Sequence, residues 1–304
     1  MARFVGLFRD FSSLFLQSSG NNSVSCDIEA TLIRATRHHQ SRMDDVSMER
    51  LLIHVCLQPE SSVPSLVDCI SRRLEKTKNR RVALKALLLI HRILRFDRRM
   101  HMARAVDSLQ LDRFWFMKNE DPSSVFLRNY AALLKERAGW TLNQSDHRLE
   151  PVVNRSESGV EPAAFHVLTK CQWFVEKVLA CAPVNVKPID NLVLAALRTV
   201  LEESFKIYET YTDELKNLFT VFFDLSEPER TRACGILRAA SQQYRDLRGF
   251  YEKCRESAVD ASLEYPSVEV IDVGCITSLE EFTSATSVRT SNSFHTKFSS
   301  RIFR

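Results

Sequence analysis

The sequence predicts an all-α protein, built as a superhelical, solenoid-like stack of helices that continues into a long antiparallel helical hairpin. Apolar residues recur at spacings of three and four along most of the chain, which is typical of amphipathic helices. Only seven glycines and nine prolines occur in 304 residues, and runs with strand-like alternation are few. The eight cysteines are scattered, without a CxxC pair. We therefore expect buried, reduced cysteines in a cytosolic protein rather than disulfides or zinc ligands.

The N-terminal segment carries large apolar side chains on one helical face. They are Phe4, Leu7, Phe8, Phe11, Leu14 and Phe15. Such a stripe could lie in a membrane interface, but we favour packing on the domain body, because long apolar stripes usually belong to a core. Arg9 and Asp10 interrupt the apolar part, which is not typical of a secretion signal. No run reaches the roughly 18 apolar residues that a membrane-spanning helix needs.

Three further helices are predicted before residue 77. The first is Asp27–Arg37, with Asp27 as its N-cap, and the second is Val46–Cys56. Two prolines then interrupt the chain, so the third helix is predicted to begin only at Ser65 and to end at Lys76.

The run Leu74–Arg95 is the most informative in the chain. It opens with alternating cations and passes directly into a helix that is apolar around most of its circumference. These cations are Lys76, Lys78, Arg80 and Arg81. The apolar part predicts a helix surrounded by other helices. A basic first turn is usually just a solvated helix end, and the more specific interpretation is that it faces an anionic membrane surface.

The chain then alternates helices with irregular segments. After a basic segment through Arg104, a helix is predicted over Ser123–Gly139, with the glycine as C-cap. Residues 143–161 are polar and without periodicity, which predicts a flexible loop.

Longer helices follow this loop. They are predicted over Phe165–Cys181 and Pro188–Phe222, and a capping box formed by Ser226 and Glu229 opens another that runs to about Cys254. The last two are joined by a short turn, which predicts the helical hairpin. After residue 266 the regularity fades, and the end of the chain is rich in Ser, Thr and basic residues.

Four runs resemble the ANTH domain family of plant clathrin assembly proteins, within the ENTH/ANTH/VHS superfamily, and the chain is similar to its short, AP180-like members. They are DIEATLIRATRH at 27–38, LEKTKNRRVALKALLLIHRILR at 74–95, FLRNYAALLKERAGW at 126–140 and, more weakly, YPSVEVIDVGCITSLEEF at 265–282. The resemblance covers about residues 1–285. It implies an ENTH-like N-terminal helical part at 1–142 and a helical extension of the ANTH domain at 162–282, on either side of the flexible loop at 143–161. The composition of residues 283–304 predicts a disordered basic tail.

The resemblance also implies a function. Proteins of this family are non-enzymatic endocytic adaptors without cofactors, which bind phosphoinositides such as phosphatidylinositol 4,5-bisphosphate and bring clathrin-coat components to the membrane. It implies a cytosolic protein that is peripheral on membranes, in clathrin-coated pits and vesicles, with the Golgi apparatus as a further location. Clathrin or coat adaptors and a SNARE helix are the implied protein partners, although we find no clathrin-binding peptide motif in the sequence.

The resemblance implies a lipid site at the end of the first helix of the motif. The family's Lys-Ala-Thr-x-His signature matches residues 34–38. The basic run that should follow is replaced at 43–47, where Asp44 and Asp45 occur. Two acids beside an anionic headgroup weaken attraction, so we expect weaker or less selective binding. The predicted headgroup contacts are Arg34, Arg37, His38, Lys76, Lys78 and Arg80, of which Arg34 and His38 rest on the motif and the others on charge.

Three alternatives stay open. The serious one is a helical interaction scaffold that has lost lipid and clathrin binding. An enzyme is the weakest, because the chain has no Gly-rich phosphate loop, metal-spaced Cys/His cluster or nucleophile elbow. Nucleic-acid binding is disfavoured because aromatic residues do not interleave with the basic ones.

Overall fold

The computed structural model describes residues 21–38, 42–96, 101–115, 118, 120–143, 148–152, 163–183, 190–257, 259–260 and 262–285. The regular elements among these residues are helices and one two-stranded sheet, which confirms the predicted fold class. The chain divides into two compact units, the first formed by residues 1–138 with 188–193 and the second by 139–187 with 194–304. The predicted aromatic stripe at 4–15 and the tail beyond 285 lie outside the described residues.

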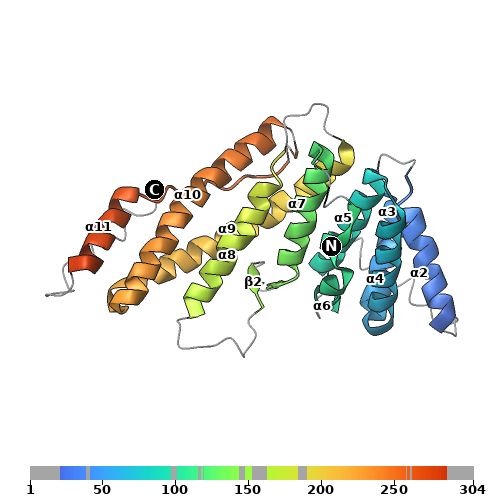
Figure 1. Ribbon diagram of the computed structural model, residues 1–304, viewed down its shortest axis with the longest axis horizontal. Coiled ribbons are helices and arrows are strands. Elements are labelled where there is room, and N and C mark those ends of the chain that lie inside the picture. The colour runs from blue at the N-terminus through green and yellow to red at the C-terminus, as the bar shows by residue number, and fades with distance from the viewer. Residues whose placement is uncertain are drawn as a thin grey trace. The chain divides into compact units, whose positions relative to one another are not determined.

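The first unit is a stack of helices around a buried helix, α5 (Figure 1). Its helices are α2 (Asn21–Ala35), α3 (Asp45–Leu57), α4 (Pro59–Lys76), α5 (Arg80–Phe96), α6 (His101–Val106) and α7 (Pro122–Arg137), with 3-10 turns at Asp107–Leu109 and Leu111–Arg113. Every residue from Val82 to Ile90 is buried. Because α5 packs on α3, α4, α6 and α7, its apolar circumference is covered as predicted.

The start of α2 differs from the prediction. Asp27 lies inside this helix, so its assignment as an N-cap is wrong. Its carboxylate instead accepts hydrogen bonds from Arg50 Nη2 at 3.0 Å and from His54 Nε2 at 3.1 Å, both on α3. An acid that forms a tertiary ion pair therefore looked like a local helix-start signal.

The start of α4 also differs. This helix begins at Pro59 and continues through Pro64, six residues before the predicted start at Ser65. Pro59 occupies the first turn, where a missing N–H costs nothing. Pro64 should weaken the helix, but it is flanked by Val63 and Leu66, which are 3% and 1% exposed. Their burial helps to offset the proline.

A small hairpin opens the second unit. Strand β1 (Trp140–Leu142) pairs antiparallel with β2 (Leu149–Pro151), with Thr141 opposite Glu150. The second strand lies within the segment predicted as a loop, so that prediction is wrong for residues 149–151. Three-residue strands are too short for alternation to be read from the sequence.

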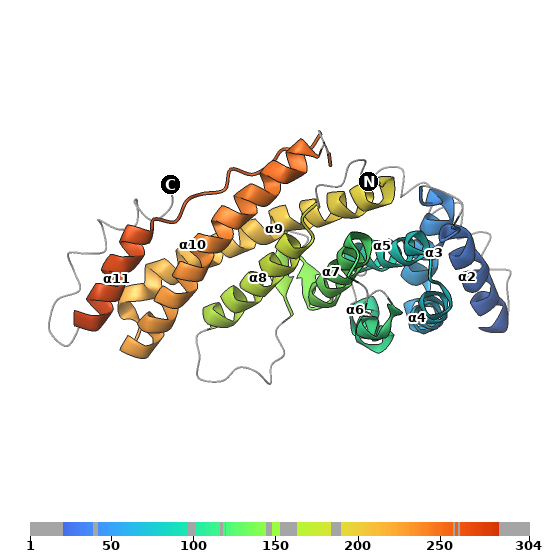
Figure 2. The same cartoon turned by 45° about the horizontal axis from the view of Figure 1, so that its top comes forward.

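The second unit is dominated by two long helices (Figure 2). It contains α8 (Ala163–Ala180), α9 (Asn191–Val221, of which 191–193 are grouped with the first unit), the 3-10 turn Phe222–Asp224, α10 (Glu227–Glu256) and α11 (Val273–Ala285). Tyr211 Oη donates to Gln243 Oε1 at 3.0 Å, and Ser204 Oγ lies 3.3 Å from Tyr251 Oη. The residue with the lower number on α9 thus pairs with the residue of higher number on α10. The two helices therefore run antiparallel, which confirms the predicted hairpin.

Helix α11 was not predicted from periodicity, although the resemblance implies a helical extension as far as residue 282. It packs on α10 and buries Ile276 and Leu279, which are 0% and 1% exposed. Its other residues include a glycine and several Ser and Thr, which have low helix propensity, so tertiary packing decides its structure.

No disulfide joins any of the eight cysteines, all of which lie in the described part of the chain. Six are buried, as the sequence predicts, whereas Cys26 and Cys56 are exposed.

Candidate functional site

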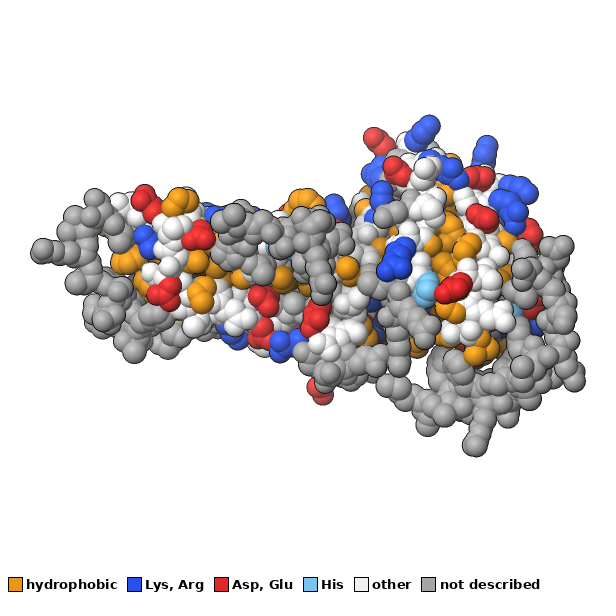
Figure 3. Space-filling view, turned by 90° about the horizontal axis from the view of Figure 1, so that it is seen from below, with side chains coloured by type: hydrophobic (Ala, Val, Ile, Leu, Met, Phe, Trp, Pro, Cys, Tyr) orange, Lys and Arg blue, Asp and Glu red, His pale blue; other side chains and the backbone are white. Residues whose placement is uncertain are grey.

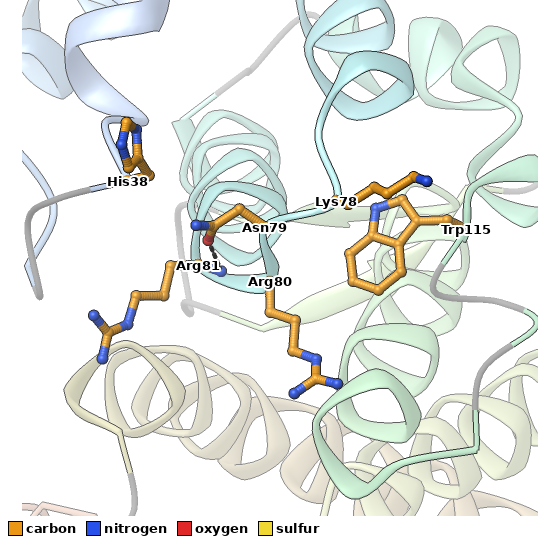
Figure 4. A pocket seen from close by; sticks show the side chains of 6 residues that line it. All are labelled: His38, Lys78, Asn79, Arg80, Arg81 and Trp115. Carbon is orange, nitrogen blue, oxygen red and sulfur yellow. Dashed lines mark hydrogen bonds between the residues drawn. The ribbon is translucent and has the colours of Figure 1, made fainter.

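An open depression lies at the start of α5, in the first unit. Its volume is about 760 Å³. It is lined by His38, Lys78, Asn79, Arg80, Arg81 and Trp115 (Figure 4). The structure thus brings together three of the six predicted headgroup contacts, namely His38, Lys78 and Arg80.

The turn before α5 is fixed by its own side chains. The amide N–H groups of Arg81 and Val82 donate to Asn79 Oδ1 at 2.9 and 3.4 Å. The amide of Asn79 donates in turn to Thr77 Oγ1 at 3.1 Å. Asn79 therefore acts as the N-cap of α5. The next two residues, Arg80 and Arg81, lie in the first turn of the helix, where the helix dipole is positive. In Figure 4 their guanidinium groups extend apart, with His38 to one side and Lys78 and Trp115 to the other.

The segment just beyond α2, which carries His38, is held by two cations of neighbouring helices. Lys85 Nζ donates to the carbonyl oxygen of Arg37 at 2.7 Å. Arg73 donates to Thr36 Oγ1 at 3.1 Å and to its carbonyl at 3.2 Å. Burial lowers the pKa of both Lys85 and Arg73. These contacts satisfy carbonyls that the helix end leaves without an intrahelical partner.

Each arginine of the depression forms an ion pair with an aspartate. Arg80 Nη2 lies 3.1 Å from Asp121 Oδ1, and Arg81 Nε lies 3.2 Å from Asp190 Oδ2. Asp121 is the N-cap of α7, where it accepts hydrogen bonds from Ser124 N at 3.1 Å and Ser124 Oγ at 2.5 Å. The bond from the Ser124 hydroxyl is the main cause that lowers the pKa of Asp121.

The two acids at the family's cation positions have structural roles. Asp44 is the N-cap of α3 and accepts bonds from Ser47 N at 3.4 Å and Ser47 Oγ at 2.7 Å. These bonds lower the pKa of Asp44, with the hydroxyl contributing most. Asp45 Oδ1 lies 3.2 Å from Arg92 Nη1. Both carboxylates are thus held by nearby groups of the first unit.

Three predicted contacts do not line the depression. Arg34, Arg37 and Lys76 are exposed, and Arg34 Nε donates to the carbonyl of Ala30 at 3.2 Å. Their part in lipid binding stays a prediction.

Sequence reasoning missed three lining residues: Asn79, Arg81 and Trp115. Arg81 belongs to the cation run that drew attention to this helix, so the charge pattern could have included it. Trp115 comes from a segment more than thirty residues further along the chain, and no sequence signal connects it to the depression.

The lining of the depression carries positive charge. Its charged lining residues are basic or His, and no carboxylate lines it within the described ranges. Among the described residues, no three His, Cys, Asp or Glu side chains gather as metal ligands. None of the helices described here combines the length and apolar character that crossing a bilayer requires.

Comparison with known proteins gives the family. Residues 27–285 match the family described as "ANTH domain". An Arabidopsis thaliana protein named "putative clathrin assembly protein" is 44% identical over 294 residues, covering 92% of this chain and 78% of the relative. Two others of that name and organism are 27% and 28% identical, covering 86% and 93% of this chain but only 41% and 52% of their own lengths.

A solved structure has a similar fold. The ENTH domain from epsin-2, in complex with phosphatidylinositol 4,5-bisphosphate, superposes with a TM-score of 0.53 at 13% identity, covering 82% of this chain and all of that one. This similarity is evidence for the fold alone. The family match spans most of the sequence and the 44% identical relative spans nearly all of it. This chain therefore belongs to the ANTH domain family of non-enzymatic adaptors.

Proposed function

We propose that this protein is a clathrin-associated endocytic adaptor that binds phosphoinositide headgroups at the basic depression of its first unit. The observation that carries the proposal is the gathering of His38, Lys78, Arg80 and Arg81 around one open surface. The names of the Arabidopsis relatives support the clathrin association. The lipid bound by the epsin-2 domain, a structure of similar fold, supports a phosphoinositide ligand.

The physical basis of binding is electrostatic. A basic residue close to an anionic membrane surface contributes about 1 kcal/mol, and charge-assisted hydrogen bonds to phosphate add geometric selectivity. Because the depression is open, it suits phosphates presented at a bilayer surface better than a ligand that must be enclosed. Phosphatidylinositol 4,5-bisphosphate is the lipid we propose.

The proposed function sets a location and partners. The protein would be cytosolic and peripheral on membranes, in clathrin-coated pits and vesicles and at the Golgi apparatus. Clathrin or coat adaptors are its proposed protein partners, with a SNARE helix as a further one.

Co-sedimentation with liposomes tests the lipid site. Vesicles containing phosphatidylinositol 4,5-bisphosphate are compared with phosphatidylserine vesicles of equal total charge. We expect preferential binding to the former, and a loss of about tenfold or more in Lys78→Glu, because one charge reversal changes the electrostatic contribution by about two basic residues.

Lys135→Glu is the matched control. Lys135 is also an exposed lysine of the first unit, but it lies near the end of α7, about 21 Å along the helix from Asp121. Equal losses in the two variants would show that only net charge matters. A protein that binds phosphoinositide vesicles no better than phosphatidylserine vesicles would favour the interaction scaffold instead.

A further inference from the structure

The two arginines of the depression are adjacent in sequence, yet their aspartate partners come from two different helix starts. Asp121 precedes α7 and Asp190 precedes α9. All four side chains are only partly exposed or about half-exposed, at 53% and 51% for Arg80 and Arg81 and 32% and 33% for the two acids. On the face seen in Figure 3, Asp and Glu side chains likewise stand beside the Lys and Arg side chains of the helices described in the first unit.

The aspartates do not depend on the arginines for their positions. Both carboxylate oxygens of Asp121 accept bonds from Ser124. Oδ1 of Asp190 accepts the amide N–H of Leu192 at 2.9 Å, which leaves Oδ2 for Arg81. Each acid is therefore anchored by its own helix and stays in place when the arginine side chain moves.

We infer that Asp121 and Asp190 are internal competitors of the ligand, so that a phosphate group must displace a carboxylate from Arg80 and from Arg81 in order to bind. This inference rests on the proposed function. A carboxylate carries one negative charge, and so does the phosphodiester of an ordinary phospholipid. A phosphomonoester carries about 1.5 to 2 negative charges and three acceptor oxygens. The ligand class that competes successfully is therefore the phosphomonoester, as on the 4- and 5-positions of a phosphoinositide.

The competition is weak enough to be overcome. Exposed ion pairs shift an equilibrium by about two- to fivefold each, so two pairs lower the affinity by about four- to twenty-five-fold. The acids thus tune the site without closing it.

Asparagine substitutions isolate the charge. Asn caps a helix about as well as Asp, so Asp121→Asn and Asp190→Asn keep the acceptor for the first turn and remove the competitor. Far-UV circular dichroism and a melting curve check that the double variant folds. Its affinity for phosphatidylinositol 4,5-bisphosphate vesicles, and for soluble inositol 1,4,5-trisphosphate by titration calorimetry, is expected to rise by about four- to twenty-five-fold.

The control changes the same net charge elsewhere on the first unit. Glu29 pairs with Arg72 and Glu75 with Arg113, and all four side chains are about half-exposed. Glu29→Gln with Glu75→Gln therefore also removes two negative charges and leaves two arginines without their ion-pair partners. Equal gains in the two double variants, or no gain in the aspartate variant, would overturn the inference.

A further variant tests the route of the effect. Adding Arg80→Gln and Arg81→Gln to the aspartate double variant should remove the gain, because the acids act through these arginines. A gain that persists without them would overturn the inference. If the wild-type protein binds phosphoinositide and the aspartate variant binds no better, only the inference fails. If neither protein binds vesicles or the soluble headgroup, the proposed lipid site fails as well.

Discussion

The ammonium group of Lys85 on α5 donates a 2.7 Å hydrogen bond to the backbone carbonyl of Arg37, just beyond the end of α2. Lys85 is fully buried, and burial is the main cause that lowers its pKa. This contact joins the central helix to the segment that carries His38. A residue in the core thereby positions a residue of the candidate site.

Replacing Lys85 should destabilise the first unit. In Lys85→Met the apolar stem is kept, but the Arg37 carbonyl loses its donor, which costs about 1–3 kcal/mol of unfolding free energy. Urea denaturation followed by circular dichroism measures this loss. The exposed Lys135→Met should change stability by less than about 0.5 kcal/mol. If the two variants were equally stable, the buried hydrogen bond would have no net value.

Stability should fall on mild acidification because of His54. Burial lowers the pKa of His54, although the carboxylate of Asp27 acts in the opposite direction. The unfolded chain therefore takes up the proton at a higher pH than the folded protein does. The contribution of His54 to the free energy of unfolding is fully present above the ordinary histidine pKa of about 6.5. It is lost progressively as the pH falls through that value towards the lowered pKa.

Urea denaturation at a series of pH values checks this expectation. His54→Gln should flatten the profile below pH ~6.5. A profile that keeps its full slope without the His54 imidazole would assign the pH dependence to other groups.

Two glycines in the middle of α10 offer stabilising substitutions. A Cβ atom added at Gly235 or at Gly249 would meet no atom within 4 Å. Each change to alanine should raise the unfolding free energy by about 0.5–1 kcal/mol, because alanine has the higher helix propensity. Thermal and urea denaturation measure the gain.

Gly274→Ala provides the contrast. A Cβ there would lie 3.3 Å from Asp272 Oδ1, which already accepts a 2.8 Å hydrogen bond from the Gly274 amide. We expect a smaller gain than at either α10 position. A gain of equal size would mean that the α11 start adjusts easily.

Trp115 should report ligand binding by its fluorescence. It lines the depression with Lys78 and Arg80, so phosphates bound there change the polarity of the surroundings of its indole ring. Trp115→Phe is expected to abolish the emission change that soluble inositol 1,4,5-trisphosphate causes, while Trp173→Phe on α8 keeps it. An unchanged response without Trp115 would place the ligand elsewhere.

Much of the fold could be predicted from periodicity. The apolar circumference of α5 and the stripes of α9 and α10 persist over many turns, so all three could be predicted to be helices, and α9 and α10 to form a hairpin. Where the prediction failed, tertiary contacts decided. Asp27 pairs with residues on another helix, and Pro64 is carried inside α4 by the burial of its neighbours.

The site could be predicted only in part. Four cations lie close together in the sequence at 76–81, which made this segment a candidate site. Three of the predicted contacts line the depression. Asp121 and Asp190, which neutralise two of these cations, lie about 40 and 110 residues further along the chain. Both also read as ordinary helix-start residues, so nothing local in the sequence indicates that they face the arginines.

The six buried cysteines can report when the helices around them open. Thiol reagents attack the thiolate, and burial raises the pKa of Cys254 to about 12 and raises those of Cys171 and Cys181 further. In the native state a maleimide should therefore modify Cys26 and Cys56 quickly and the other six slowly, only when the helices separate. Mass spectrometry of partly modified samples would then time the opening of individual helices, without any added probe or substitution.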